Sequence, residues 1–195
     1  DNVETWTITT NPLTYSNNDV STNIPVVTGI YATATLAKMV TVDEAGNATV
    51  VYTDLQGKVV FKKVQVGAVA SDYSGYTGFL CTYYVYDGFE ALRFVIPPRV
   101  VALLLTAGNW SLTSDMINEL CFRYEYDGRR RMAAKKVPGS AWAYMVYDAR
   151  DRMVFSQDGN MRQKNQWLTL LYDGLDRGVQ TGMTTYSGTP AALQA

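Results

Sequence analysis

The sequence has no histidine and only two cysteines among its 195 residues. Without histidine it lacks the usual general base near neutral pH, the Ser/His and Cys/His catalytic pairs, and the commonest ligand of zinc and copper. Cys81 and Cys121 form no Cys-x-x-Cys pair and cannot make a zinc site alone, so we expect no metal and no cofactor. Each cysteine lies six residues before the aspartate of a Tyr-Asp pair. These equivalent positions leave open a disulfide between the two, but the default expectation is two free thiols buried in the core.

The sequence also has little net charge and no long apolar run. The net charge of −1 argues against a nucleic-acid or lipid-surface binder. Val100 to Leu105, the longest apolar stretch, is far shorter than the ~20 residues of a membrane helix, and no signal-peptide pattern is present. Residues 121–152 carry eight Lys/Arg against four Asp/Glu, but these interleave with turns, which favours a solvated rim of ion pairs over nucleic-acid binding.

Strand patterns dominate what is present. Apolar and polar residues alternate over 4–10 and 30–39, the period of a half-buried strand. The exception is a helical insertion near 98–120, with Gly108 ending one helix and Thr113 to Asp115 supplying cap oxygens for a second. The sequence therefore predicts a mostly β fold, a curved antiparallel meander of hairpins with a short helical insertion.

One unit recurs along the chain, and its core is Tyr-Asp. Its clear copies are strands that stop at an aspartate, and two divergent copies come first; the six aspartates are Asp43, Asp54, Asp87, Asp127, Asp148 and Asp173. The third residue after the aspartate is glycine or polar, and the fourth is often basic. An aspartate that accepts its own loop's amides, followed by a residue with positive φ, is typical of a β-hairpin. Glu90 and Arg130 at the third position predict a different turn type there. A further turn is expected at 158–160.

These units resemble the YD-repeat, or Rhs (rearrangement hotspot), proteins of bacteria, particularly the large surface or secreted members in Bacteroidetes. The likeness spans roughly 36 to 182, and its residues are Tyr84-Val-Tyr-Asp-Gly-Phe-Glu-Ala-Leu-Arg93, Tyr124-Glu-Tyr-Asp-Gly-Arg-Arg-Arg-Met132, Tyr147-Asp-Ala-Arg-Asp-Arg-Met153, Asp43-Glu-Ala-Gly-Asn47 and Leu120-Cys-Phe-Arg-Tyr124. The resemblance implies spirals of hairpins that wind into a hollow shell, often around a C-terminal toxin or for adhesion and carbohydrate contact. It implies a secreted or cell-surface location.

The chain divides by pattern into three parts. A Thr-rich β segment over 1–40 is expected to continue the sheet, the hairpin region covers 41–187, and a tail covers 188–195. The chain starts with Asp1 rather than Met, so we expect a piece of a longer protein. Its partners would be the remainder of the repeat shell and, through uncovered sheet edges, another copy of itself.

We expect a non-enzymatic structural segment, forming scaffold wall for adhesion, carbohydrate contact or toxin delivery. The turn aspartates recur at every hairpin, whereas a catalytic carboxylate pair would occupy unique positions. The alternative is a free-standing carbohydrate-binding module, in which exposed indole rings stack on sugars. The candidate stacking residues are Trp110, Trp142 and Trp167, although core packing is the competing interpretation.

Overall fold

The structure, a computed structural model, describes residues 2–9, 13 and 23–193. The fold is mostly β with a few short helices, as the sequence predicts. The chain forms two compact units, one from 1–9 with 24–122 and the other from 10–23 with 123–195. Each unit is described by itself.

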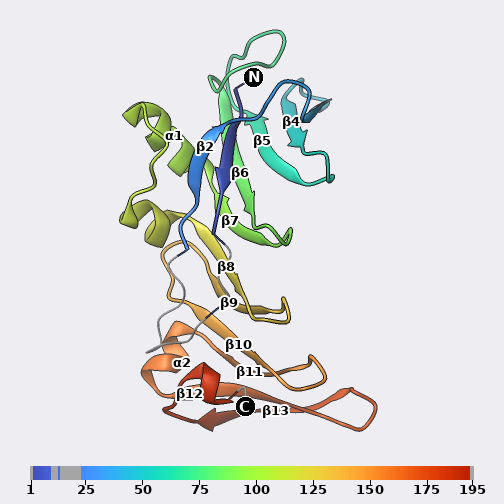
Figure 1. Cartoon of the computed structure of the whole chain (residues 1–195), viewed down its shortest axis with the longest axis vertical. Helices are drawn as coiled ribbons and strands as arrows, with labels where there is room; N and C mark the ends of the chain where they lie inside the picture. Colours follow the sequence, from blue (N-terminus) through green and yellow to red (C-terminus); the bar gives the residue numbers. More distant parts are fainter. Residues whose placement is uncertain (1, 10–12, 14–22, 194–195) are drawn as a thin grey trace. The chain divides into compact units, whose positions relative to one another are not determined.

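The first unit contains a five-stranded antiparallel meander (Figure 1). Each strand pairs with the next along the chain, and the strands are β3 (Ala37–Val42), β4 (Ala48–Thr53), β5 (Val59–Gln65), β6 (Phe79–Tyr86) and β7 (Leu92–Ile96). Burial alternates along β4 and β6, so one face of the sheet carries the core.

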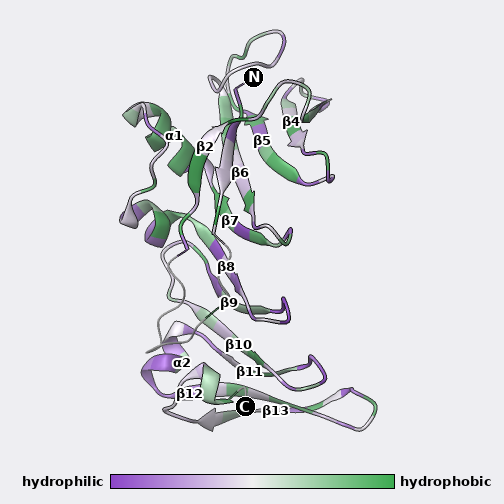
Figure 2. Ribbon diagram, viewed as in Figure 1, coloured by the Kyte–Doolittle hydropathy of each residue, from purple (hydrophilic) through white to green (hydrophobic). Residues whose placement is uncertain are grey.

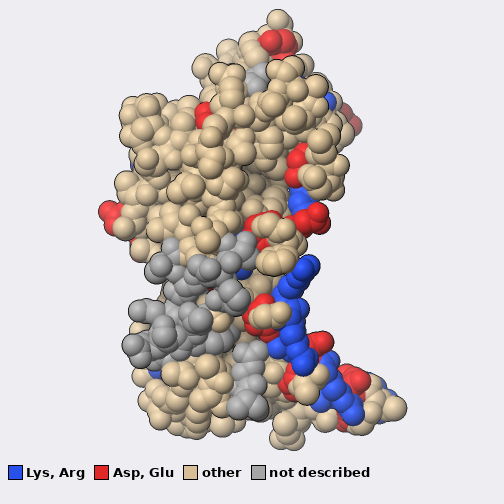
Figure 3. Space-filling model, viewed as in Figure 1, with Lys and Arg blue, Asp and Glu red and all other residues tan. Residues whose placement is uncertain are grey.

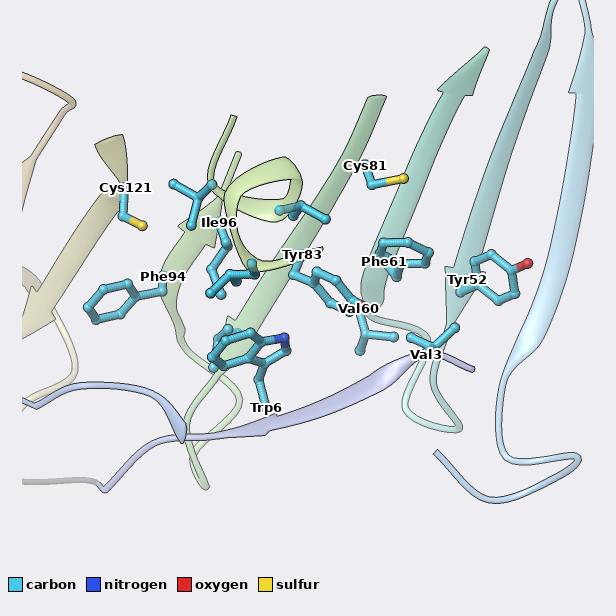
Figure 4. Close-up of a cluster of buried hydrophobic side chains, with 14 of the residues drawn as sticks. Val3, Trp6, Tyr52, Val60, Phe61, Cys81, Tyr83, Phe94, Ile96 and Cys121 are labelled. Carbon is cyan, nitrogen blue, oxygen red and sulfur yellow. The ribbon is translucent and has the colours of Figure 1, made fainter. Parts of the chain in front are cut away.

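The amino-terminal strands do not continue this sheet, which corrects the expectation for 1–40. β1 (Glu4–Thr7) and β2 (Val26–Ile30) form a separate two-stranded sheet. The physical reason is that Val3 and Trp6, 2% and 7% exposed, pack against the buried face of the meander (Figure 4). A strand that buries such side chains on a sheet face covers that face instead of extending the edge.

The single strand expected over 30–39 is also wrong. β2 ends at Ile30 and β3 begins at Ala37, and a turn lies between them. In this turn Ala34 has φ of 64°, and the Thr35 amide donates to the Ala32 carbonyl at 3.2 Å. Alternating sequence alone does not distinguish one long strand from two strands joined by a turn of ordinary residues.

The helical insertion follows β7 and is confirmed. α1 (Pro98–Ala107) begins with proline in its first turn and ends at Gly108 with φ of 65°. Its buried residues Val100, Val101 and Leu104 join the core of the first unit, and the helix is apolar in Figure 2. A short π-helical turn, η2 (Met116–Leu120), follows, and the Met116 amide donates to the Thr113 hydroxyl at 3.2 Å.

The second unit is a six-stranded antiparallel meander. Its strands are β8 (Phe122–Tyr126), β9 (Met132–Lys136), β10 (Ala143–Tyr147), β11 (Met153–Gln157), β12 (Gln166–Tyr172) and β13 (Gly178–Thr185). Ala134, Tyr144, Val146 and Trp167 form its buried cluster. The turn between β8 and β9 is hydrophilic (Figure 2), whereas the residues of the buried cluster lie on strands.

Two short helices complete the second unit. The turn expected at 158–160 is wrong in kind, because Asp158 instead caps α2 (Gly159–Gln163) by accepting from the Met161 amide at 2.8 Å. α3 (Pro190–Leu193) lies within the predicted tail. Over the described ranges, no helix is long and apolar enough to cross a membrane.

Candidate functional site

The candidate site is the set of hairpin turns built on the six recurring aspartates. At Asp127 the carboxylate Oδ1 accepts the amides of Arg129 and Arg131, each at 2.9 Å. The Asp127 amide donates to the Arg131 carbonyl, and the Arg130 amide donates to the Asp127 carbonyl. The same four bonds form at the other five aspartates, Asp43, Asp54, Asp87, Asp148 and Asp173.

All six turns are of one type, so the different turn expected at Glu90 and Arg130 is wrong. The third residue after each aspartate has positive φ, from 62° at Asp176 to 83° at Gly46, with Glu90 at 68° and Arg130 at 63°. This is the three-residue hairpin loop in which a left-handed residue follows a type I turn. The carboxylate and backbone bonds of the turn hold even bulky residues in a conformation that otherwise favours glycine.

The position of the turns follows from the meander. β4 is shared by the hairpins of Asp43 and Asp54, so within the first unit these two turns lie at opposite ends of that strand. In the second unit Asp127, Asp148 and Asp173 close alternate connections and therefore lie along the same edge. Acidic and basic side chains alternate along that edge (Figure 3).

A basic residue links each hairpin of the second unit to the next one. Arg131 binds its own Asp127, with Nη2 2.6 Å from Oδ2, and also Asp151 of the following turn, with Nη1 2.7 Å from Oδ1. Its guanidinium carbon lies 4.7 Å from the centre of the Tyr147 ring. One cation therefore contacts two carboxylates and one ring, which belong to two hairpins.

The next hairpin repeats this arrangement residue for residue. Arg152 binds its own Asp148 at 2.6 Å and Asp176 of the following turn at 2.5 Å, and lies 4.7 Å from the Tyr172 ring centre. A second arginine in each turn adds to the link, because Arg129 reaches Asp151 at 3.1 Å and Arg150 reaches Asp176 at 3.0 Å. We call these contacts between successive turns the turn ladder.

The tyrosines before Asp148 and Asp173 supply a third contact. The Tyr147 hydroxyl donates to the Met132 carbonyl at 2.8 Å, and the Tyr172 hydroxyl donates to the Met153 carbonyl at 2.8 Å. Each acceptor is the fifth residue after the aspartate of the preceding turn. The Tyr-Asp pair thus has two separate tasks, since the aspartate closes its own turn and the tyrosine binds the turn before it.

The first unit contains the same link with lysine in place of arginine. Lys58 lies 2.7 Å from Glu90 of the following turn and 5.8 Å from the Tyr86 ring centre. The Tyr86 hydroxyl donates to the Val59 carbonyl at 3.2 Å. The acid at the third position and the base at the fourth are therefore functional residues whose pairing the sequence analysis missed. The signal was present in the aligned turns as opposite charges offset by one repeat.

The electrostatics of the second unit's turns favour ionised carboxylates at Asp127, Asp148 and Asp173. Burial raises the pKa of Asp127, but hydrogen bonds from the Arg131 side chain and amide outweigh it and leave this pKa lowered. The pKa of Asp148 is lowered chiefly by the Arg152 side chain, and that of Asp173 chiefly by the Arg177 amide. Carboxyl groups of lowered pKa stay charged near neutral pH, a state that suits ion pairs better than proton donation.

Of the three tryptophans predicted for glycan stacking, Trp110 belongs to the first unit, and Trp142 and Trp167 to the second. Trp167 is 1% exposed, so burial overturns a stacking role for it. Trp110 is half-buried, and its ring packs edge-on against Trp6 and Tyr83 at centroid distances of 6.2 and 5.7 Å. Trp142 is half-buried beneath the Arg123 guanidinium, 4.8 Å from the ring centre. Trp142 packs against the buried cluster of the second unit that contains Trp167.

A cavity of about 300 Å³ lies in the first unit beside the Asp54 and Asp87 turns. Tyr31, Tyr84 and Tyr86 line it. The acidic residues Glu4 and Asp54 also line it. Burial raises the pKa of Glu4, and burial together with the charge of Asp54 raises that of Tyr31. Aromatic faces beside polar groups suit a small polar ligand.

Cys81 and Cys121 are not joined in a disulfide, and both are buried in the core of the first unit. Among the described residues no group of three or more His, Cys, Asp or Glu is placed to hold a metal ion.

Comparison with known proteins gives a structural likeness. No protein-family model and no curated protein matches the chain. Among solved structures it is similar to TcdB2–TccC3 without the hypervariable C-terminal region, with a TM-score of 0.50 and 16% sequence identity over 72% of this chain and 6% of that chain. The chain shares the β fold of a segment of that protein. The Photorhabdus luminescens Tc holotoxin pore also matches, with a TM-score of 0.49 and 15% identity over 76% of this chain and 6% of that chain. This chain spans about 6% of the length of the chains it matches.

Proposed function

We propose that this chain is a non-enzymatic wall segment of a larger repeat shell, of the kind that belongs to a toxin complex, in a secreted or cell-surface protein. The observation that carries the proposal is the turn ladder, in which Arg131 and Arg152 bind an acid of the following turn while Tyr147 and Tyr172 bind the backbone of the preceding hairpin. Such contacts suit a structure that grows by adding hairpins. The likeness in fold to TcdB2–TccC3 supports it.

The chemistry of the turns supports a structural role over catalysis. The aspartate Oδ1 atoms accept two turn amides each, and Asp127, Asp148 and Asp173 also bind arginine. A general acid of a glycosidase needs a raised pKa, and these three have lowered ones. The lowered pKa values fit permanent ion pairs between neighbouring hairpins.

The test is an electron cryomicroscopy map of the protein translated from the complete reading frame that contains this sequence. We expect residues 37–185 in the wall of a hollow shell, with β3 and β13 each paired to a further strand. A map in which both of these strands face solvent would contradict the proposal.

A second candidate function is carbohydrate binding at the cavity of the first unit. It is favoured by the tyrosines and acidic residues that line the cavity. A sugar can stack its apolar face on tyrosine and form hydrogen bonds from its polar edge to a carboxylate. Trp6 also lines the cavity, so its fluorescence serves as a reporter. We expect a specific saccharide from a glycan array to change this emission and Tyr84→Ala to abolish the change, while Tyr124→Ala, a matched tyrosine outside the cavity, leaves it intact.

A further inference from the structure

The outer edge of β13 is the place where the turn ladder stops. β13 pairs with β12 from Gly178 to Thr185, and over the described part of the chain it is the last strand of its sheet. Every residue of β13 is exposed. A strand of this kind presents unpaired N–H and C=O groups along one side and is a template for another strand.

The base of the last turn is positioned like its counterparts but is far more exposed. Arg177 binds its own Asp173, with Nη2 2.7 Å from Oδ2, as Arg131 and Arg152 bind theirs. The Arg177 side chain is 71% exposed, against 15% for Arg131 and 23% for Arg152. Arg131 and Arg152 are less exposed because the following hairpin places a carboxylate and a tyrosine ring against each of them.

The backbone acceptor for a tyrosine is in place as well. The acceptors at the earlier turns, Met132 and Met153, are the fifth residues after Asp127 and Asp148. The equivalent residue after Asp173 is Gly178, the first of β13, which is exposed. Arg177 and Gly178 together therefore present the receiving half of one further ladder contact.

We propose that the β13 edge binds a β-hairpin of the sequence Tyr-Asp-x-x-Asp or Tyr-Asp-x-x-Glu, which adds its first strand antiparallel to β13. The tyrosine hydroxyl donates to the Gly178 carbonyl, the ring lies against the Arg177 guanidinium, and the acid pairs with Arg177. This inference deepens the proposed function and rests on it, because it specifies the chemistry of the neighbouring hairpin.

A second folded copy of this chain does not fit the edge. The strands that lead into Tyr-Asp-x-x-acid turns here are β6, β10 and β12, and each already has a strand on both sides. β3, the edge strand of the first unit, leads into Asp43 with Val42 before it and Gly46 at the third position. It therefore offers neither the tyrosine nor the acid.

The test uses the full chain and a backbone-cyclised peptide with the sequence of residues 166–185, which contains Tyr172, Asp173 and Asp176. Cyclisation is needed because an isolated two-stranded hairpin is marginally stable, and NMR of the peptide first verifies its strands. We expect the peptide to slow hydrogen exchange of the β13 amides. Binding should weaken as salt increases, since the central contact is an exposed ion pair.

Charge reversal identifies the contact. Arg177→Glu should weaken binding about tenfold, and a peptide carrying Asp176→Arg should recover most of that loss. Arg99→Glu, the same charge change on an exposed residue of α1, is the matched control and should leave binding unchanged.

Three results would overturn the inference: no protection of β13 by the folded peptide, binding unaffected by Arg177→Glu, or self-association of the chain that protects β13 without peptide. These outcomes are distinct from failure of the proposed function. A complete protein without a shell removes the shell role but leaves peptide binding measurable, whereas a shell whose neighbour at β13 lacks the acid or tyrosine removes only this inference.

Discussion

Each turn aspartate closes its own hairpin through hydrogen bonds within the loop. Asp127, Asp148 and Asp173 also form an ion pair with an arginine. Asp127→Ala removes two amide bonds and leaves the half-buried Arg131 without its nearest carboxylate. We expect the free energy of unfolding to fall by about 2 kcal/mol, from the loss of charged hydrogen bonds. Chemical denaturation measures it. Glu44→Ala removes an exposed carboxylate from the Asp43 turn and should change stability little.

Acid should unfold the protein partly through these same groups. Asp127, Asp148 and Asp173 have lowered pKa values in the folded state, so the unfolded chain binds more protons as the pH falls. Their contribution to stability is fully present above the unfolded pKa of about 3.9 and is lost as the pH falls through the folded values. Stability measured against pH should decline more gently below pH ~4 in Asp148→Asn, and equal slopes would contradict this origin.

Substitutions at the third position of the turns, where φ is positive, can distinguish the effect of backbone strain on stability from the effect of side-chain packing. Gly57 has φ of 81°, and a Cβ there would meet nothing within 4 Å. Gly57→Ala should therefore lower the free energy of unfolding by about 1–2 kcal/mol through backbone strain alone. Gly128→Ala, one residue after a turn aspartate and also in open space, is the control and should not destabilise. Equal effects at the two sites would show that φ is not the cause.

At the scale of elements, β1 is held by its side chains and not by the edge of the main sheet. Trp6 packs against Tyr83 and Trp110 at centroid distances of 6.1 and 6.2 Å. Trp6→Ala should cost about 3–5 kcal/mol and should release β1 and β2 from the sheet face, which hydrogen exchange of their amides would detect. Val26→Ala, on the exposed part of β2, is the matched control. Unchanged exchange in Trp6→Ala would contradict this anchoring role.

The sequence predicts elements best where a turn residue and a strand pattern agree. The mostly β fold and the helical insertion between Pro98 and Leu120 are predicted because alternation, proline and Gly108 all act locally. The separate sheet of β1 and β2 is not predictable in this way, since Trp6 alternates equally well in an edge strand or in a strand across a face. Asp158 is ambiguous for the same reason, because aspartate begins hairpin turns and helices alike.

In the candidate site, contacts within one turn can likewise be predicted from the sequence, whereas contacts between turns cannot. Local hydrogen bonds at the six aspartates follow from spacing within one turn. The link from Arg131 to Asp151 requires knowing that two turns, about twenty residues apart, lie side by side. Burial of Trp167 is likewise a property of the packed unit, since its sequence neighbours alone also permit an exposed ring.

At the scale of the whole molecule, the two thiols report on cooperative opening of the first unit. Cys81 and Cys121 are 3% and 0% exposed within one hydrophobic cluster. We expect both to react with a thiol reagent only at the rate of unfolding, and at one common rate, because exposing either requires opening the same core. Ser114→Cys places a thiol on an exposed residue and should react at once. Fast reaction of either native cysteine in the folded protein would contradict a single cooperative core.

The offset of the ladder restricts how such a protein can evolve. Arg131 pairs with Asp151 and Arg152 with Asp176, so a hairpin with a base at the fourth position of its turn fits a following hairpin with an acid at the third position. Loss of one hairpin by recombination would remove such a match: without the Asp87 hairpin Lys58 would precede Arg130, and without the Asp127 hairpin Ala91, which has no charge, would precede Asp151. The base of one turn and the acid of the next therefore form a matched pair, and a substitution at one of them should be accompanied by a compensating substitution at the other.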